Sequence, residues 1–151
     1  MRNIRKLFLS FILLLTPFIV WAGGLSCNWG EVVVNNLETG KSYDLGKYAA
    51  APFTLTNNFD DEVPLNLKVL LPLEKELKPG YEALPDPSWV KLSKEEIKIP
   101  GLSKGTVDVT LNVPSDSQYA GKKYQFWIWT YTSGKAMGVG LKSRILVTIR
   151  K

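Results

Sequence analysis

Apolar and polar residues alternate along much of this chain with a period of two, the pattern expected for β-strands that bury one face. The alternation is clearest in residues 106–113 (TVDVTLNV), where every second residue is valine or leucine. An amphipathic helix would repeat its apolar residues every three or four positions, and no long segment after Glu31 does so. The pattern therefore predicts a chain that folds almost entirely into β-strands.

The predicted strands are short and are separated by residues that favour turns. Residues 73–88 hold three prolines and a glycine and are predicted to be a long loop. Residues 43–46 are a weaker strand candidate, and residues 95–96 also fit a helical turn. A series of about seven to eight such strands is typical of an immunoglobulin-like Greek-key sandwich, an all-β fold. The clear strand segments are 31–36, 52–58, 63–72, 89–93, 96–99, 106–113, 123–132 and 139–150.

The last two strand segments predict a terminal hairpin whose outer face carries an aromatic strip. Within residues 123–132, Phe126 and Ile128 are expected to point into the core. Residues that alternate with them must then point outward, because successive side chains of a strand lie on opposite faces. These outward residues are Gln125, Trp127, Trp129 and Tyr131.

A hairpin register centred in the loop of residues 133–138 would set basic side chains beside these rings, where cations and rings attract each other. An exposed strip of this kind commonly marks a contact surface, here for a protein partner or for a sugar polymer of the cell wall. The alternative is that the loop 73–88, or a neighbouring subunit, covers the rings. The candidate binding residues, paired as this register places them, are Trp127 with Arg144, Trp129 with Lys142, and Tyr131 with Gly140.

Residues 1–22 have the parts of a cleavable secretory signal peptide. The first six residues include three basic ones, an apolar stretch follows, and small side chains at Val20 and Ala22 suit signal peptidase. Cleavage is predicted between Ala22 and Gly23. The apolar run is shorter than the roughly 20 residues that a membrane span needs, so no stable span is expected after processing.

Export predicts an extracytoplasmic location: the periplasm, the cell surface or the surrounding medium. Residues 23–29 are expected to be a flexible N-terminus, and residues 30–151 to form the sandwich. Because the signal carries three of the 19 basic residues and none of the 14 acidic ones, its removal lowers the net charge from +5 to +2. The basic character therefore belongs mostly to the export signal, and no nucleic acid partner is expected.

Cys27 is the only cysteine, so it cannot form a disulfide within the chain. Lipidation is one reading, although Gly24, Leu25 and Ser26 fit a lipoprotein signal poorly. An intermolecular disulfide is another reading. A passive thiol near the flexible terminus is the third.

Several kinds of chemistry are excluded or disfavoured by composition. The chain has no histidine, which removes Ser-His-Asp catalysis and histidine metal sites, and one cysteine cannot build a zinc cluster. The acidic residues of the turn 57–62 and of the loop 73–88 do not have the spacing of a calcium loop and are expected to be solvated. We therefore predict no enzyme, no cofactor and no metal site.

Three segments resemble the immunoglobulin-like domains of bacterial and archaeal extracytoplasmic proteins, such as surface glycosidases and cell-wall-associated surface proteins. They are residues 89–93 (WVKLS), 99–114 (IPGLSKGTVDVTLNVP) and 120–128 (AGKKYQFWI). The resemblance implies a sandwich fold and a role as spacer, scaffold or adhesion module, and it implies that Tyr124 is the corner tyrosine. It supplies no catalytic residue.

The sequence thus favours a non-catalytic interaction or structural module of the cell envelope or surface. A stand-alone carbohydrate-binding module that uses the aromatic strip is the first alternative. A periplasmic chaperone-like sandwich that adds a strand to a client, with Lys142 and Arg144 as anchor, is the second. The oligomeric state is left open.

Overall fold

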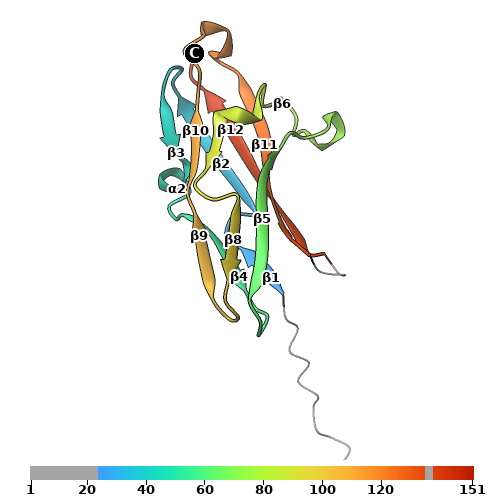
Figure 1. The fold of residues 1–151 in the computed structure, drawn as a ribbon. Helices are drawn as coiled ribbons and strands as arrows, with labels where there is room; N and C mark the ends of the chain where they lie inside the picture. The colour runs from blue at the N-terminus through green and yellow to red at the C-terminus, as the bar shows by residue number, and fades with distance from the viewer. Residues whose placement is uncertain (1–23, 135–137) are drawn as a thin grey trace, which may run out of the picture.

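The computed structural model describes residues 24–134 and 138–151, and these form a β-sandwich of two layers (Figure 1). The predicted signal peptide and its cleavage site at Ala22 lie outside the described residues. The first layer is a six-stranded sheet in the order β2-β12-β11-β5-β8, with β6 beside β11. Its strands are β2 (Glu31–Leu37), β5 (Val63–Leu70), β6 (Glu82–Ala83), β8 (Glu96–Ile99), β11 (Lys123–Thr132) and β12 (Gly140–Ile149).

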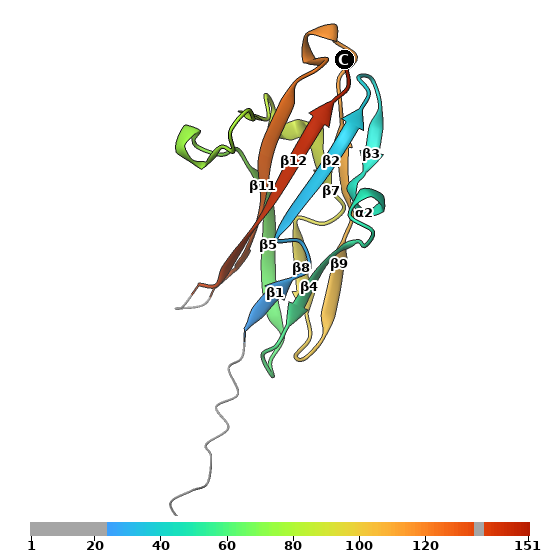
Figure 2. The ribbon, with the colours of Figure 1, turned by 180° about the vertical axis from the view of Figure 1, so that it is seen from behind.

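The second layer consists of two three-stranded sheets, ordered β1-β4-β9 and β3-β10-β7. Short helical segments link some of the strands. Seen from behind, the strands of both layers run roughly along the long axis of the molecule (Figure 2). The strands of this layer are β1 (Leu25–Cys27), β3 (Ser42–Asp44), β4 (Phe53–Asn57), β7 (Val90–Leu92), β9 (Lys104–Val107) and β10 (Val109–Asn112). The helical segments are α2 (Leu45–Tyr48), η1 (Glu74–Glu76), η2 (Pro87–Trp89) and η3 (Ser117–Tyr119).

The core lies between the layers and is filled by the residues that alternate inward. Phe126 and Ile128 are fully buried, as predicted, and so are Leu111 and Val107. This confirms an immunoglobulin-like all-β fold. The predicted strand at residues 96–99 is also confirmed: β8 spans Glu96–Ile99, and its first residue is not part of a helical turn.

The predicted single strand 106–113 is in fact two strands, and they belong to different sheets. Asp108 separates β9 from β10. Its backbone N–H donates to Ser93 Oγ at 2.8 Å, and its carbonyl accepts from the Ser93 N–H at 2.9 Å. Ser93 in turn lies where the chain passes from β7 to β8. The two hydrogen bonds therefore join the β7–β8 connection to the β9–β10 connection.

The expectation of a flexible N-terminus at residues 23–29 was wrong for most of that segment. Leu25–Cys27 form β1, which pairs antiparallel with β4. Trp29 is almost fully buried, its ring centroid lies 5.2 Å from that of Phe53, and its Nε1–H donates to Ala51 O at 3.2 Å. Burial of this large aromatic side chain in the core fixes the segment against the sandwich.

Two smaller expectations also change. The weak strand candidate at residues 43–46 ends at Asp44, whose carboxylate accepts from the Gly46 N–H and caps the short helix α2. The loop 73–88 is long, as predicted, but contains η1, β6 and the start of η2. Figure 1 shows it as an excursion from the end of β5 that returns along β11.

Candidate functional site

The outer face of the hairpin β11–β12 brings the predicted site residues together. Trp127 pairs with Arg144, Trp129 with Lys142, and Tyr131 with Gly140. This is the register that the sequence predicted, and it is confirmed. The face continues on to β5, where Leu70, Lys68 and Asn66 stand opposite the same three aromatic residues.

Trp127 faces outward but is covered, with only 8% of its surface exposed. Lys142 Nζ lies 5.3 Å and Arg144 Cζ 4.7 Å from the centroid of its ring. Both cations therefore contact the indole, as the sequence predicted, yet the ring is no longer free to bind a partner. Of the two readings of the strip, covering therefore applies at this end, and the loop 73–88 takes part in it through the ion pair of Glu76 with Lys142.

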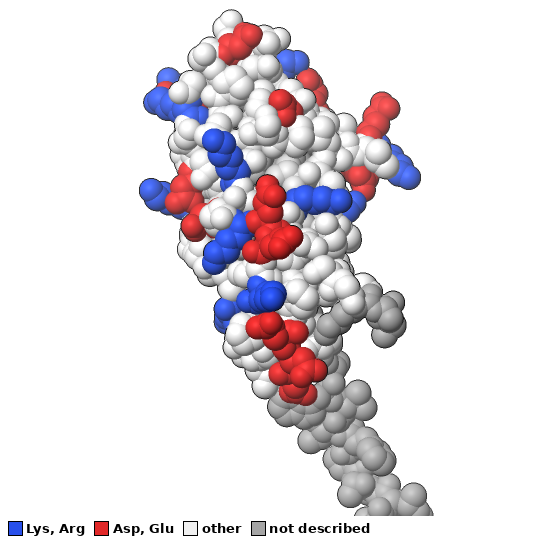
Figure 3. Space-filling model, viewed as in Figure 1, with Lys and Arg blue, Asp and Glu red and all other residues white. Residues whose placement is uncertain are grey.

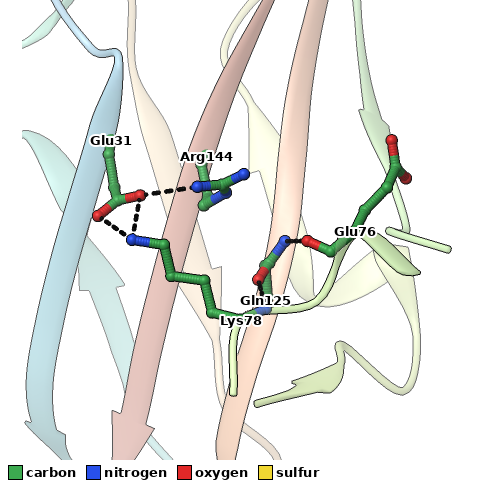
Figure 4. Close-up of polar contacts among 5 residues, drawn as sticks. All are labelled: Glu31, Glu76, Lys78, Gln125 and Arg144. Atoms are coloured by element: carbon green, nitrogen blue, oxygen red, sulfur yellow. Dashed lines mark hydrogen bonds and ion pairs between the residues drawn. The ribbon is translucent and has the colours of Figure 1, made fainter. Parts of the chain in front are cut away.

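Gln125 fastens that loop to the sheet, although a glutamine on the outer face of a strand would ordinarily be solvated. Its side chain is fully buried. Nε2 donates to Glu76 O at 2.9 Å, and Oε1 accepts from the Lys78 N–H at 2.9 Å (Figure 4). The Leu84 N–H also donates to the Gln125 carbonyl at 3.0 Å, next to the parallel pairing of β6 with β11. The amide of Gln125 thus bonds to backbone groups of the loop in the way that a neighbouring strand would.

Ion pairs surround the covered tryptophan and join the loop to β2 and β12. Glu31 accepts from Arg144 at 3.0 Å and from Lys78 at 2.8 Å, as Figure 4 shows. Lys142 Nζ lies 3.1 Å from Glu76 Oε1. The hydrogen bonds from Lys78 and Arg144 hold the pKa of Glu31 below its usual range. The backbone N–H of Leu73, followed by Lys142, does the same for the pKa of Glu76.

These lowered pKa values predict that acid loosens the loop. A carboxyl group whose pKa is lower in the folded protein stabilises it above the unfolded pKa, and this contribution is lost as the pH falls through the folded pKa. For Glu31 and Glu76 the loss begins below the ordinary value of 4.5. We expect tryptophan fluorescence to change reversibly in this range before global unfolding. In Glu31→Gln the change should be smaller, whereas Glu62→Gln, in the β4–β5 turn, should titrate like the unaltered protein.

Trp129 and Tyr131 lie beyond the covered part and stay half-exposed. Three carbons of the Trp129 six-membered ring lie 2.3–3.0 Å from where a Cβ on Gly140 would stand. The ring therefore lies across the backbone of β12, and only glycine leaves room for it there. The Tyr131 ring is inclined by 22° to it with a centroid distance of 6.1 Å, and Lys68 Nζ lies 5.4 Å from the tyrosine centroid.

We call Trp129, Tyr131, Lys68 and Lys142 the aromatic platform. A shallow groove of about 230 Å³ adjoins it between β5 and β8. Polar side chains from both strands line this groove next to Tyr131, because Tyr131 pairs with Asn66 and Asn66 pairs with Glu96. The groove is lined by Pro64, Leu65, Asn66, Glu96, Ile97, Lys98 and Ser133.

The sequence did not reveal that Lys68 and Asn66 belong to this face. Alternation assigns a residue to one side of its own strand, but it does not tell which strands are neighbours. The pairing of β5 with β11 links residues about 60 positions apart. The alternation in residues 63–72 could show only on which face of the strand each residue lies. It correctly placed Leu65 and Leu67 on the inward face and Asn66 and Lys68 on the outward face.

Cys27 does not lie on a flexible terminus. It is the last residue of β1, half-buried, with its Sγ 3.4 Å from Trp29 O and 3.5 Å from Ser143 Oγ. Tyr124, proposed as the corner tyrosine, packs against Trp89 and Tyr119 at centroid distances of 5.9 and 6.4 Å. Burial raises the pKa of its phenol. A corner tyrosine bonds through its hydroxyl to backbone a few residues upstream. Among the described residues the Tyr124 hydroxyl makes no such bond, so the corner-tyrosine role implied by the resemblance was wrong.

Charges on the side of the molecule seen in Figure 3 are mixed, with basic and acidic side chains next to one another. Within residues 24–134 and 138–151, no three acidic or cysteine side chains come together as metal ligands. In the same part of the chain, no helix has the length and apolar character needed to cross a bilayer. The aromatic platform is thus the surface feature that most resembles a binding site.

The fold is similar to that of solved PapD-like domains. No family model and no curated protein matches the sequence. PapD-like domain 7 of human CEP192 is 10% identical, with a TM-score of 0.59 over 84% of this chain and 85% of that domain. The periplasmic chaperone SfaE is 9% identical, with a TM-score of 0.56 over 85% of this chain and 59% of the chaperone.

A protein from Bacteroides ovatus ATCC 8483, with a suggested role in carbohydrate binding, is 14% identical and has a TM-score of 0.57. The match covers 84% of this chain and 37% of that protein. The chain thus spans little more than half of the chaperone, and less than half of the Bacteroides protein. Identities this low establish a shared fold only.

Proposed function

We propose that this protein is a non-catalytic interaction module that acts outside the cytoplasm and binds a protein partner through the aromatic platform. One observation carries the proposal: Trp129 and Tyr131 stay half-exposed and flanked by two lysines, although their neighbour Trp127 is buried. Tryptophan and tyrosine are enriched among the residues that dominate binding energy. The signal-like segment 1–22 supports the location, and the likeness to a periplasmic chaperone agrees with it.

A glycan partner is the second candidate, and the position of Trp129 favours it. Because the indole lies across Gly140, one ring face rests on the sheet and the other faces solvent. Tyr131 is nearly parallel to it, and the amide of Asn66 and carboxylate of Glu96 follow in the same row. An apolar surface with a few placed polar groups is the usual make-up of a small-molecule site.

The chaperone-like alternative needs a different use of the same residues. Arg144 and Lys142 were its proposed anchor for a client terminus, and both are engaged in ion pairs with Glu31 and Glu76. In addition, β12 already has β11 on one side and, from Arg144 to Ile149, β2 on the other. A client strand cannot pair with that part of β12 unless β2 leaves.

A double substitution tests the proposal. Trp129→Ala with Tyr131→Ala should weaken binding by at least about 30-fold, because central aromatic residues of an interface commonly contribute about 2 kcal/mol or more. A photo-cross-linking residue in place of Asn66, beside Tyr131, should capture the partner from the envelope fraction. The substitution Trp127→Ala is not suitable, since that ring is buried and its loss would disturb the fold.

Tyr48→Ala is the matched control, because Tyr48 is 48% exposed and belongs to α2 on the other layer. Retention on insoluble cell-wall polysaccharide in an affinity gel identifies a glycan partner. A protein cross-linked to the photoreactive residue in place of Asn66 identifies a protein partner. If the double variant keeps both adduct and retention, the platform is not the binding surface.

A further inference from the structure

A second candidate interface lies at the side of the sandwich, where the chain passes from β7 to β8 between the two layers. β8 pairs with β5 only from Val63 to Asn66. Beyond that point the Leu67 N–H donates to Glu95 O at 2.7 Å, and the pairing ends. The upper part of β5 therefore has β11 on one side and, among the strands that the structure describes, none on the other.

The alternation of hydrogen bonds along β5 shows which backbone groups are left open. The Ser133 N–H donates to Pro64 O, so even-numbered residues of β5 bond toward β11. The bond from the Leu67 N–H to Glu95 shows that odd-numbered residues bond toward β8. The N–H and C=O of Val69 therefore point to the open side, and neither has a backbone or side-chain hydrogen bond in the described part of the chain.

A groove of about 440 Å³ lies along this open edge. Its inner wall is apolar, with Leu67 and Val69 from β5 and Val90 and Leu92 from β7. Lysines stand on both rims. The remaining lining residues are Lys68, Pro87, Ser88, Lys91 and Glu95. Its volume lies within the range of about 300–1,000 Å³ that ligand sites occupy.

Beyond the groove, the apolar residues that follow β5 are exposed to solvent. Leu71 follows Val69 by two residues and is 40% exposed, and Leu73 is 61% exposed. An open strand edge flanked by exposed leucines has hydrogen-bonding groups and apolar surface that a further strand would cover. Neither feature matches a sugar or a small anion, but both match a polypeptide backbone with an apolar side chain.

We propose that this groove binds an extended segment of a protein partner, which adds to β5 at Val69 as a strand in line with β8. Backbone groups of the segment bond to the N–H and C=O of Val69. An apolar side chain of the segment enters between Val69 and Leu92, and an outward acidic side chain lies beside Lys68. The inference rests on the proposed role in protein binding, but it uses a surface that shares only Lys68 with the aromatic platform.

The test uses the full chain, exported and purified, with a phage-displayed library of linear peptides as the probe. Enriched peptides are synthesised, and hydrogen exchange is followed by NMR at the Val69 amide. We expect the Val69 amide to exchange at least 10-fold more slowly in the complex. N-methylation of the peptide residues whose N–H faces β5 should abolish binding. N-methylation of the residues between them, whose N–H faces away from β5, should not. This measurement leaves the protein unaltered.

Val69→Pro removes the open N–H and should weaken peptide binding at least 10-fold. Val33→Pro is its matched control: the Arg144 N–H donates to Gly30 O, so the Val33 N–H points away from β12 at the outer edge of β2. The Trp129→Ala/Tyr131→Ala variant should bind the peptides unchanged. The inference is overturned if no peptide is enriched, if Val69 exchange stays the same in the complex, or if peptides bind the platform variant poorly and Val69→Pro well.

Discussion

Replacement of Asn57 by alanine is expected to destabilise the fold by about 3 kcal/mol, since each buried polar group left without a partner costs roughly 1–3 kcal/mol. Asn57 is fully buried at the end of β4. Its Nδ2 donates to the carbonyls of Asp61, Ile99 and Pro100 at 2.8–3.1 Å, and its Oδ1 accepts from the Phe59 N–H at 2.9 Å. One side chain therefore joins the β4–β5 turn to the β8–β9 turn.

Urea unfolding followed by circular dichroism measures this loss, and for a protein of this size the melting temperature should fall by about 6–12 °C. Asn58→Ala is the control next to it, because Asn58 is exposed and, among the described residues, its side chain makes a single hydrogen bond, to Ser26 Oγ at 3.4 Å. We expect Asn58→Ala to change stability by less than about 0.5 kcal/mol. Equal stability of the two variants would show that the Asn57 network does not hold the turns together.

The sequence was sufficient to predict the hairpin register, and the reason lies in the period of two. Phe126 and Ile128 could be placed inside only if Trp127 and Trp129 were outside, because a shift by one residue would turn every side chain over. A short loop between the strands then leaves one pairing that opposes Trp127 to Arg144. Local pattern and loop length together determine such a hairpin.

The strand breaks could not be predicted in the same way. Residues 106–113 alternate without interruption, and nothing local marks Asp108 as the boundary between β9 and β10. The break arises from the contact with Ser93, fifteen residues away, which the alternation of either segment does not encode. The open edge of β5 has the same origin, since it exists because the chain changes layers next to Ser93.

Gln125 is the clearest case of a residue whose role the pattern concealed. By alternation it is an outward polar residue of β11 and should be solvated. The structure buries it fully, because the loop from η1 to β6 folds back over it and brings the backbone of Glu76 and Lys78 to its amide. The cover over Trp127, and with it the size of the aromatic platform, therefore depends on a residue that carries no sequence signal of its own.

Gln125→Leu should consequently release the loop while the sandwich stays folded. Leucine has a similar volume but leaves the Glu76 carbonyl and the Lys78 N–H without partners, at a cost of about 2–4 kcal/mol to the docked loop. That cost exceeds what the partly exposed ion pairs of Glu31 and Glu76 can offset. Hydrogen exchange of residues 73–84 should accelerate, and trypsin should cleave faster after Lys75.

Gln118→Leu is the matched control, because Gln118 is exposed in η3 and, within the described part of the chain, its side chain hydrogen-bonds only to Asp116. It should leave exchange in residues 73–84 and cleavage after Lys75 unchanged. Release of the loop should also uncover Trp127, so that acrylamide quenches the tryptophan fluorescence of Gln125→Leu more strongly. If exchange in residues 73–84 is as slow in Gln125→Leu as in the unaltered protein, then β6 pairing and the Glu31–Arg144–Lys78 contacts are enough to hold the loop. In that case charge sets the extent of the platform, and acid should loosen the loop of Gln125→Leu below the ordinary glutamate value of 4.5, as in the unaltered protein.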